Sequence, residues 1–222
     1  LEDLLQRGVS AGASLVEVFA ERTDHLGLLA EQDNITSVNP SFACGAGIRV
    51  FRGERDGFVS TNDLSRDGLT RALEQALAML GLEIGTRDSA AGFQGLCALI
   101  NHAATKEDWL QRCPSMAAAG DRLKQGTAHL ERLGQHLQVR RGSYSRDWQE
   151  VLVAASDGTF ARDIRLHQST GLSVLAADGD YRASIGRRYG STDRPEDLVN
   201  WNSETSATEV CESAGKMLRA DY

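Results

Sequence analysis

The stretch from Gly47 to Leu69, GIRVFRGERDGFVSTNDLSRDGL, decides the fold class. Two short runs in which apolar and polar residues alternate flank the segment Glu54–Gly57, and a helical pattern follows them. The pair Asp56–Gly57 is typical of the positive φ angles of a tight turn. The sequence therefore predicts a β-hairpin that leads directly into a helix.

The helix is predicted over about residues 65–80, with Asp63 or Ser65 as its N-cap. Its apolar residues recur at helical spacing and form one stripe: Leu69, Leu73, Ala76, Leu77 and Leu80. Gly45 and Gly47, in the first strand of the hairpin, indicate a bulge or a close backbone approach.

Upstream of the hairpin, the pattern predicts a short helix over residues 1–12 and then three strands. The first two are SLVEVFAERT and HLGLLAEQD, separated at Thr23–Asp24. The third covers Asn34–Val38 and ends at Asn39–Pro40. The predicted hairpin and helix complete a first part, residues 1–82.

Residues 83–105 are rich in Gly and Ala, have no firm period and are predicted to be a linker or an irregular segment. Residues 106–222 are predicted to contain a helix that Pro114 kinks or restarts, an antiparallel meander and a C-terminal helix from Ser203 or Glu204. Asp157–Gly158 and Asp178–Gly179 mark two further tight turns. Because no βαβ alternation occurs, the predicted fold is α+β, a mainly antiparallel sheet with packed helices.

Composition limits the classes of function. The chain has 222 residues and a net charge of −7, so a sequence-independent hold on nucleic acid is not expected, although a local basic patch is possible. No apolar run reaches the roughly 20 residues that span a bilayer, and the first residues lack the order of a signal peptide. We therefore expect a cytoplasmic protein with no membrane contact. Because Leu1 stands where Met would start a chain, we also expect a fragment of a longer protein.

Motifs for catalysis and metal binding are absent from the sequence. No His is followed by Glu, His129 and His136 lie too far apart for one metal, and no C-x-x-C occurs. The four Cys residues are expected to be reduced thiols. Arg187–Arg188 could hold an anion, but we favour an edge-strand charge that blocks aggregation. The residues alone predict no active site.

Two segments resemble the TldD/PmbA family, also called modulators of DNA gyrase. The stretch GAGIRVFRGERDGFVSTNDLSRDGLTRALEQALAM is similar to the family's N-terminal signature. The matching positions are Gly45, Gly47, Arg49, Gly53, Gly57, Phe58, Ser60 and Thr61. The region Val151–Gly190 is similar to the family's second sheet segment, with its Gly-rich part reduced to Gly186 and Gly190. The run AASDGTFARDIR is closer to the TldD branch than to the PmbA (TldE) branch.

This resemblance implies a function for the parent protein. TldD-type members are zinc metalloproteases that bind zinc through an H-E-x-x-x-H helix and a later Cys, and this helix is expected beyond Tyr222. Residues 1–222 would then be the N-terminal scaffold domain of a metallopeptidase that cuts unfolded or peptide substrates, with a TldE/PmbA-like partner subunit or a second copy of itself. The fragment alone is expected to bind no zinc and to be inactive.

An antiparallel sheet with a free edge can hold an extended peptide through main-chain hydrogen bonds. The residues expected to bind peptide, or to build the hairpin that does, are Gly45, Gly47, Arg49, Gly57, Phe58, Arg187 and Arg188. Two alternatives stay open. The chain could be a non-catalytic peptide-binding or assembly module, such as the partner subunit itself, or part of an unrelated sheet-rich enzyme.

Overall fold

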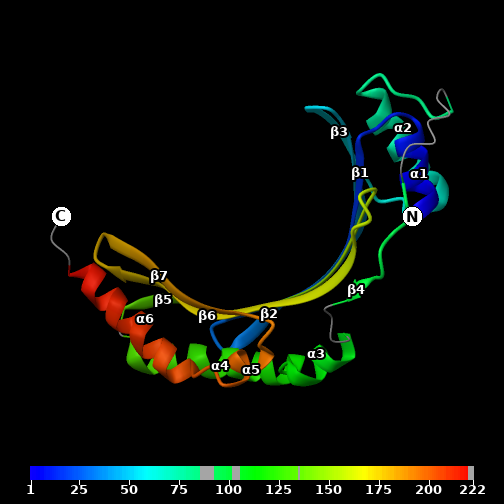
Figure 1. The fold of residues 1–222 in the computed structure, drawn as a ribbon. Coiled ribbons are helices and arrows are strands. Elements are labelled where there is room, and N and C mark those ends of the chain that lie inside the picture. The colour runs from blue at the N-terminus through cyan, green and yellow to red at the C-terminus, as the bar shows by residue number, and fades with distance from the viewer. Residues whose placement is uncertain (86–92, 102–105, 135, 220–222) are drawn as a thin grey trace. The chain divides into compact units, whose positions relative to one another are not determined.

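The structure is a computed structural model that describes residues 1–85, 93–101, 106–134 and 136–219 (Figure 1). Its elements in chain order are α1 (Glu2–Ser10), β1 (Leu15–Glu31), β2 (Asn34–Arg52), β3 (Arg55–Thr61), α2 (Arg66–Ala78), β4 (Ile100–Asn101), α3 (Lys106–Arg112), α4 (Met116–Leu133), β5 (Leu137–Ala155), β6 (Phe160–Asp178), β7 (Tyr181–Thr192), α5 (Pro195–Val199) and α6 (Ser203–Leu218).

The described strands pair in the order β3-β2-β1-β5-β6-β4, and β7 also pairs with β6. The β2–β3 and β6–β7 pairs are antiparallel, whereas the two-residue β4 pairs parallel to β6. Helices pack against this mainly antiparallel sheet, so the predicted α+β class is confirmed.

The chain divides into two compact units, which we describe separately. Unit 1 contains Leu1–Thr23, Phe42–Ala103 and Gln149–Ile164, and unit 2 contains Asp24–Ser41, Ala104–Trp148 and Arg165–Tyr222. Each of the long strands β1, β2, β5 and β6 contributes one part to each unit. The predicted division into residues 1–82, 83–105 and 106–222 stays a prediction, and residues 86–92 and 102–105 of its middle part lie outside the described residues.

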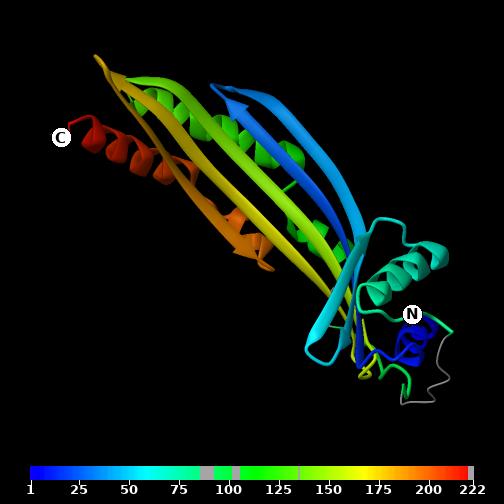
Figure 2. The same cartoon turned by 90° about the horizontal axis from the view of Figure 1, so that it is seen from above.

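In unit 1, α1 and α2 cover one face of the sheet (Figure 2). Val16 of β1 and Ile48 of β2, both even-numbered, are fully buried and belong to one core cluster with Leu5 of α1 and Leu73 of α2. Burial of side chains of this size is worth roughly 1.5–3 kcal/mol each. The odd-numbered residues of the same strands point to the opposite face, because successive strand side chains alternate.

The β2–β3 hairpin turns at a different place from the one predicted. Arg52 pairs with Arg55, so the turn consists of Gly53 and Glu54, and Gly53 has the positive φ of 61°. The predicted turn at Asp56–Gly57 is therefore wrong. Gly57 lies inside β3, and a Cβ there would sit 2.4 Å from the carbonyl oxygen of Ala76 in α2. This glycine is needed for the close approach of α2.

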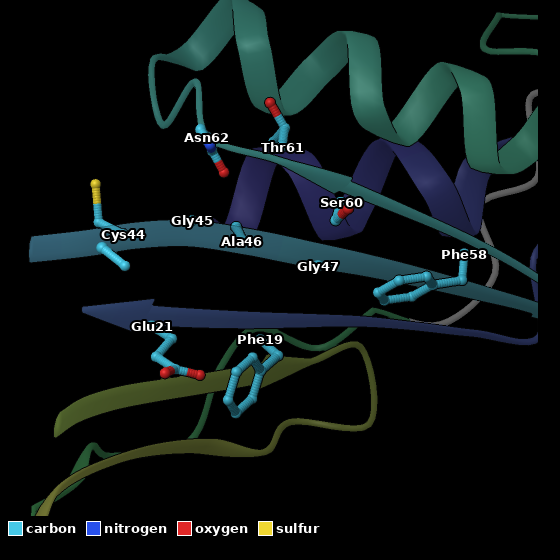
Figure 3. Close-up of a pocket in the computed structure, with 11 residues that line it drawn as sticks. Phe19, Glu21, Cys44, Gly45, Ala46, Gly47, Phe58, Ser60, Thr61 and Asn62 are labelled. Atoms are coloured by element: carbon cyan, nitrogen blue, oxygen red, sulfur yellow. The ribbon is translucent and has the colours of Figure 1, made fainter. Parts of the chain in front are cut away.

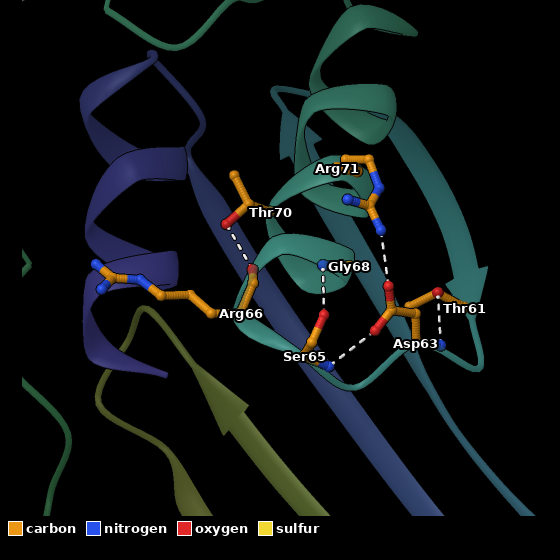
Figure 4. Close-up of polar contacts among 7 residues, drawn as sticks. All are labelled: Thr61, Asp63, Ser65, Arg66, Gly68, Thr70 and Arg71. Atoms are coloured by element: carbon orange, nitrogen blue, oxygen red, sulfur yellow. Dashed lines mark hydrogen bonds and ion pairs between the residues drawn. The ribbon is translucent and has the colours of Figure 1, made fainter.

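Helix α2 begins where the sequence predicts. The Ser65 hydroxyl accepts the backbone N–H of Gly68 at 3.1 Å, which makes Ser65 the N-cap (Figure 4). One Asp63 oxygen accepts the backbone N–H of Ser65 at 3.0 Å, and the other pairs with Arg71 at 2.7 Å. These bonds, first from Ser65 and then from Arg71, lower the pKa of Asp63 below its usual value. They fix the short segment between β3 and α2.

Two predicted strand breaks are also wrong. β1 continues through Thr23–Asp24 as one strand, and β2 runs from Asn34 through Asn39–Pro40 into the hairpin. A polar pair or a proline interrupts a strand only if it prevents pairing with the neighbouring strand, and long strands tolerate both locally. The predicted second and third strands are thus parts of β1 and β2.

Several predictions hold beyond the hairpin. The helix after residue 106 restarts near Pro114 as α4, capped by Ser115, and α6 begins at Ser203 with Asn202 as its cap. The turns at Gly158 and Gly179 have φ values of 99° and 56°. Helix α5 was not predicted, because it is too short to show a helical period. In the described residues, no helix is both long and apolar enough to cross a membrane.

The close approach of α2 to β3 yields a stability prediction. Gly57→Ala should destabilise the chain by about 2 kcal/mol, because the added methyl group meets helix backbone rather than a flexible side chain. In Gly190→Ala the methyl group makes an ordinary 3.5 Å contact, so the change should stay within about 0.5 kcal/mol. Urea unfolding followed by circular dichroism measures both, and equal effects of the two changes would contradict this packing.

The core of unit 2 yields a prediction of pH dependence. Burial raises the pKa of Tyr144 to about 12, and its hydroxyl donates to Gln168 Oε1 at 3.0 Å. The pKa of tyrosine in the unfolded chain is near 10. The contribution of the Tyr144 hydroxyl to stability is therefore complete below about pH 10 and is lost as the pH rises through about 12. Between these pH values, the free energy of unfolding of Tyr144→Phe should therefore fall by about 2 kcal/mol less than that of the wild type. Parallel pH profiles of the two proteins in urea unfolding would contradict the assignment.

Candidate functional site

A hollow of about 430 Å³ lies in unit 1, over β1, β2 and β3 (Figure 3). Residues of β1, β2 and β3, and the residue that follows β3, form its lining: Phe19, Glu21, Ala43, Cys44, Gly45, Ala46, Gly47, Phe58, Ser60, Thr61 and Asn62. Phe19, Gly47 and Phe58 belong to the sheet face opposite α1 and α2.

Glycines make the floor of this hollow. A Cβ at Gly47 would lie 2.7 Å from the Phe58 ring, and one at Gly45 would lie 3.1 Å from the Thr61 carbonyl oxygen. Figure 3 shows the Phe58 ring extending along β2 toward Gly47. The two missing side chains thus leave room that a larger residue would fill. The predicted backbone approach is found at Gly45, whereas the neighbour of Gly47 is the Phe58 side chain.

The walls of the hollow are apolar and in contact with water. Phe19 and Phe58 expose 44% and 56% of their surface, although large aromatic side chains are usually well buried. Aromatic side chains that stay exposed around a concavity are typical of binding surfaces, because a ligand can cover them.

The rim of the hollow is polar. Glu21 is the charged residue in the described lining, and its Oε1 accepts the Thr23 hydroxyl at 2.8 Å. Ser60, Thr61 and Asn62 add neutral hydrogen-bonding groups. The hollow can therefore take up an apolar side chain and hold a polar or cationic group beside it. The Glu21 carboxylate bonds to Thr23 and, among the described hydrogen bonds, to no Cys, Ser or Thr of the lining.

The structure brings together only part of the predicted site. Gly45, Gly47 and Phe58 line the hollow. Arg49 lies beside it on β2, pairs with Asp56 at 2.9 Å and stacks on an aromatic ring of the same strand.

The other predicted residues lie elsewhere. Gly57 faces α2 rather than the hollow. Arg187 and Arg188 lie on β7 in unit 2, where they pair in register with Leu172 and Gly171 of β6. β7 pairs only with β6 among the described strands, so Arg187 and Arg188 are exposed on an edge strand.

The sequence analysis missed Phe19 and Glu21. Both belong to the alternating run of β1, and their odd numbers place them opposite the buried Val16 and Val18. An apolar Phe at a position where the alternation calls for a polar residue was the signal that could have found the hollow.

The described residues contain no group of three or more His, Cys, Asp or Glu side chains that could hold a metal ion. His25 and Asp147 form a pair in unit 2, with 2.6 Å between Nδ1 and Oδ1. Burial raises the pKa of Cys113 and of Cys211, which disfavours the thiolate that binds metals or attacks substrates. No metal-dependent step can be derived from these residues.

Comparison with known families decides the relationship. A model described as PmbA/TldA metallopeptidase domain 1 matches residues 16–80, and one described as PmbA/TldA metallopeptidase central domain matches residues 102–220. The chain belongs to the TldD/PmbA family. The hollow lies in the part that the first domain's model matches.

Two curated relatives support this assignment. The metalloprotease TldD homolog of Buchnera aphidicola is 22% identical over 95% of this chain and 41% of its own length. The metalloprotease TldD homolog of Haemophilus influenzae is 26% identical over 66% of this chain and 30% of its own length. The chain therefore spans less than half the length of the TldD homologs it matches.

Solved structures share the fold. A proposed modulator of a DNA gyrase from Thermotoga maritima has a TM-score of 0.69 at 12% identity, covering 99% of this chain and 48% of its own. The corresponding protein from Bacteroides thetaiotaomicron has a TM-score of 0.70 at 11% identity, covering 99% and 49%. TldE from Thermococcus kodakarensis has a TM-score of 0.61 at 15% identity, covering 96% and 47%.

The exposed walls of the hollow predict that Phe58 contributes little to stability. Phe58→Ala should cost less than about 1 kcal/mol, whereas Ile48→Ala, at a fully buried position on the opposite face, should cost about 2–5 kcal/mol. Urea unfolding of both variants checks this. Equal losses would mean that Phe58 is a core residue and that the hollow is closed in solution.

Proposed function

We propose that this chain is the N-terminal scaffold part of a TldD-like zinc metallopeptidase that cuts unfolded or peptide substrates with a TldE/PmbA-type partner subunit. The family assignment and the TldD homologs support the class of enzyme. The likeness to a TldE structure agrees with a fold common to both kinds of subunit. On this proposal the zinc ligands belong to polypeptide outside these residues, and the chain alone is inactive.

The observation that carries the substrate proposal is the apolar hollow beside an edge strand. β3 ends the strand order, so its second edge pairs with no described strand. Its alternate backbone N–H and C=O groups point away from β2 and can pair with an extended peptide independently of the peptide's sequence. The hollow at Phe19 and Phe58 then receives an apolar side chain of that peptide.

A non-catalytic peptide-binding or assembly module is the alternative. The arrangement of the hollow's lining favours it, because the Glu21 carboxylate bonds to Thr23 rather than to a Cys, Ser or Thr of the lining that it could activate. The parent protein separates the two proposals, since a zinc-loaded protein with an intact H-E-x-x-x-H helix supports the enzyme. The expected cytoplasmic location and the lack of a direct nucleic-acid partner stay predictions.

Peptide binding is tested by titrating the chain with an unstructured peptide that carries several apolar residues, while backbone amide signals are recorded by NMR. We expect shifts concentrated in β3 and around Gly47. Phe58→Ala should weaken binding about tenfold, since a buried aromatic contact is lost. Phe42→Ala is the matched control, because Phe42 is equally exposed, at 56%, but does not line the hollow. Unchanged spectra, or equal effects of both variants, would refute this use of the hollow.

Catalysis is tested separately on the parent protein with its partner. We expect zinc-dependent peptide cleavage by that complex and none by residues 1–222 supplied with zinc. Metal-dependent cleavage by the 222-residue chain alone would contradict the scaffold role, whatever the peptide titration shows.

A further inference from the structure

Unit 2 contains a second hollow, of about 370 Å³, which the family assignment does not explain. It lies at β7, α5 and the start of α6. Its lining is Tyr189, Gly190, Asp197, Leu198, Trp201, Asn202, Thr205, Ser206 and Glu209. Its size is within the range of pockets that hold small ligands or single side chains.

Two aromatic rings form one side of this hollow. The centroids of Tyr189 and Trp201 lie 6.4 Å apart at an angle of 48°. The indole N–H of Trp201 donates to the Ser206 hydroxyl at 2.8 Å, and the Tyr189 hydroxyl donates to Glu209 at 2.7 Å. Because both rings are held by their polar atoms, they are fixed in place and supply π surface rather than hydrogen-bond donors.

The charged residues of this lining, Asp197 and Glu209, are both acidic. In the described part of the chain, Glu209 receives the Tyr189 hydroxyl but no ion pair. Asp197 accepts the Ser191 hydroxyl at 3.1 Å and has Arg194 at 3.6 Å. Arg194 is 71% exposed, and an ion pair of this kind is weak.

Other charges near the hollow do not pair with its carboxylates: Arg122 donates to the Leu198 carbonyl oxygen at 2.8 Å but forms no described ion pair with Asp197 or Glu209. Glu196 of α5 pairs with Arg112 at 2.8 Å, which leaves Asp197 as the acidic residue that α5 directs to the hollow. Arg187 lies two residues before Tyr189 on β7, but it is exposed and does not belong to the lining. The hollow therefore combines aromatic surface with an excess of negative charge.

We propose that this hollow binds the guanidinium group of an arginine side chain from a partner polypeptide. A guanidinium is planar, stacks on aromatic faces and donates paired N–H groups to carboxylates, so it matches both kinds of wall. The same unit already contains such a contact, since Arg112 lies 5.3 Å from the ring centroid of Trp109. A lysine ammonium group has the positive charge, but it is not planar and does not present two parallel N–H donors to a carboxylate. An apolar side chain would leave Glu209 without a cation.

The proposal is tested with Nα-acetyl-arginine amide as the probe and the citrulline analogue, which has nearly the same shape but no charge, as its control. The indole N–H signal of Trp201 is assigned by comparison with Trp201→Phe and followed during titration of the 222-residue chain. We expect a saturable shift with the arginine compound, a weaker affinity for the lysine compound and no saturation with citrulline. An equal response to arginine and citrulline, equal affinity for lysine, or no shift would overturn the proposal.

Two variants check that the carboxylate acts directly. Glu209→Gln should weaken arginine binding about threefold or more, since it removes the charge beside the rings. Glu212→Gln removes the same charge from the same helix at an exposed position outside the lining, and should leave binding unchanged. Equal effects would show a general charge effect and refute the site. Because the hollow at Phe58 is in unit 1, failure here leaves the peptide proposal unaffected.

Discussion

One constraint underlies unit 1: an antiparallel sheet must bury one face to be stable, but it can leave the other in water. Here α1 and α2 cover the face that carries Val16 and Ile48, both fully buried. The strict alternation of strand side chains then forces Phe19 and Phe58 to the opposite face. Exposed aromatic rings are thus a consequence of the packing on the other face. Because Gly45 and Gly47 have no side chains, a hollow is left beside these rings.

Local signals in the sequence predicted local structure well. Ser65 was readable as a helix cap, Pro114 as the point where a helix restarts, and Asp157–Gly158 and Asp178–Gly179 as turns, because a few neighbouring residues decide each of these features. The fold class followed from the same patterns. The predicted hairpin also exists, although its turn lies at Gly53–Glu54.

The errors have a common cause in long-range packing. Gly57 looks like a turn residue, but α2 requires it because a Cβ there would collide with Ala76. Thr23–Asp24 and Pro40 look like strand ends, but the strands continue through them. Long-range packing also decides which predicted site residues lie together: Arg187 and Arg188 belong to the other unit, and the exposure of Phe19, which the prediction did not name, depends on which face the helices cover. Sequence spacing alone does not contain this information.

Family membership and the described residues carry different information about function. Membership supports a metallopeptidase as the parent protein, whereas the described residues contain no cluster that could hold a metal. What they do contain is binding surface: an apolar hollow beside an edge strand in unit 1, and an aromatic, acidic hollow in unit 2. A scaffold that holds polypeptide for chemistry performed elsewhere needs surfaces of this kind.

Photo-cross-linking in the parent protein tests this central claim most directly. A photoreactive benzoyl-phenylalanine is placed at position 58, in the hollow, or at the exposed position of Arg71, on the helix that covers the opposite face. The account predicts that a bound peptide substrate is cross-linked from position 58 and not from position 71. Cross-linking from position 71 alone, or from neither position while the peptide is still cut, would show that the open face of this sheet does not hold the substrate.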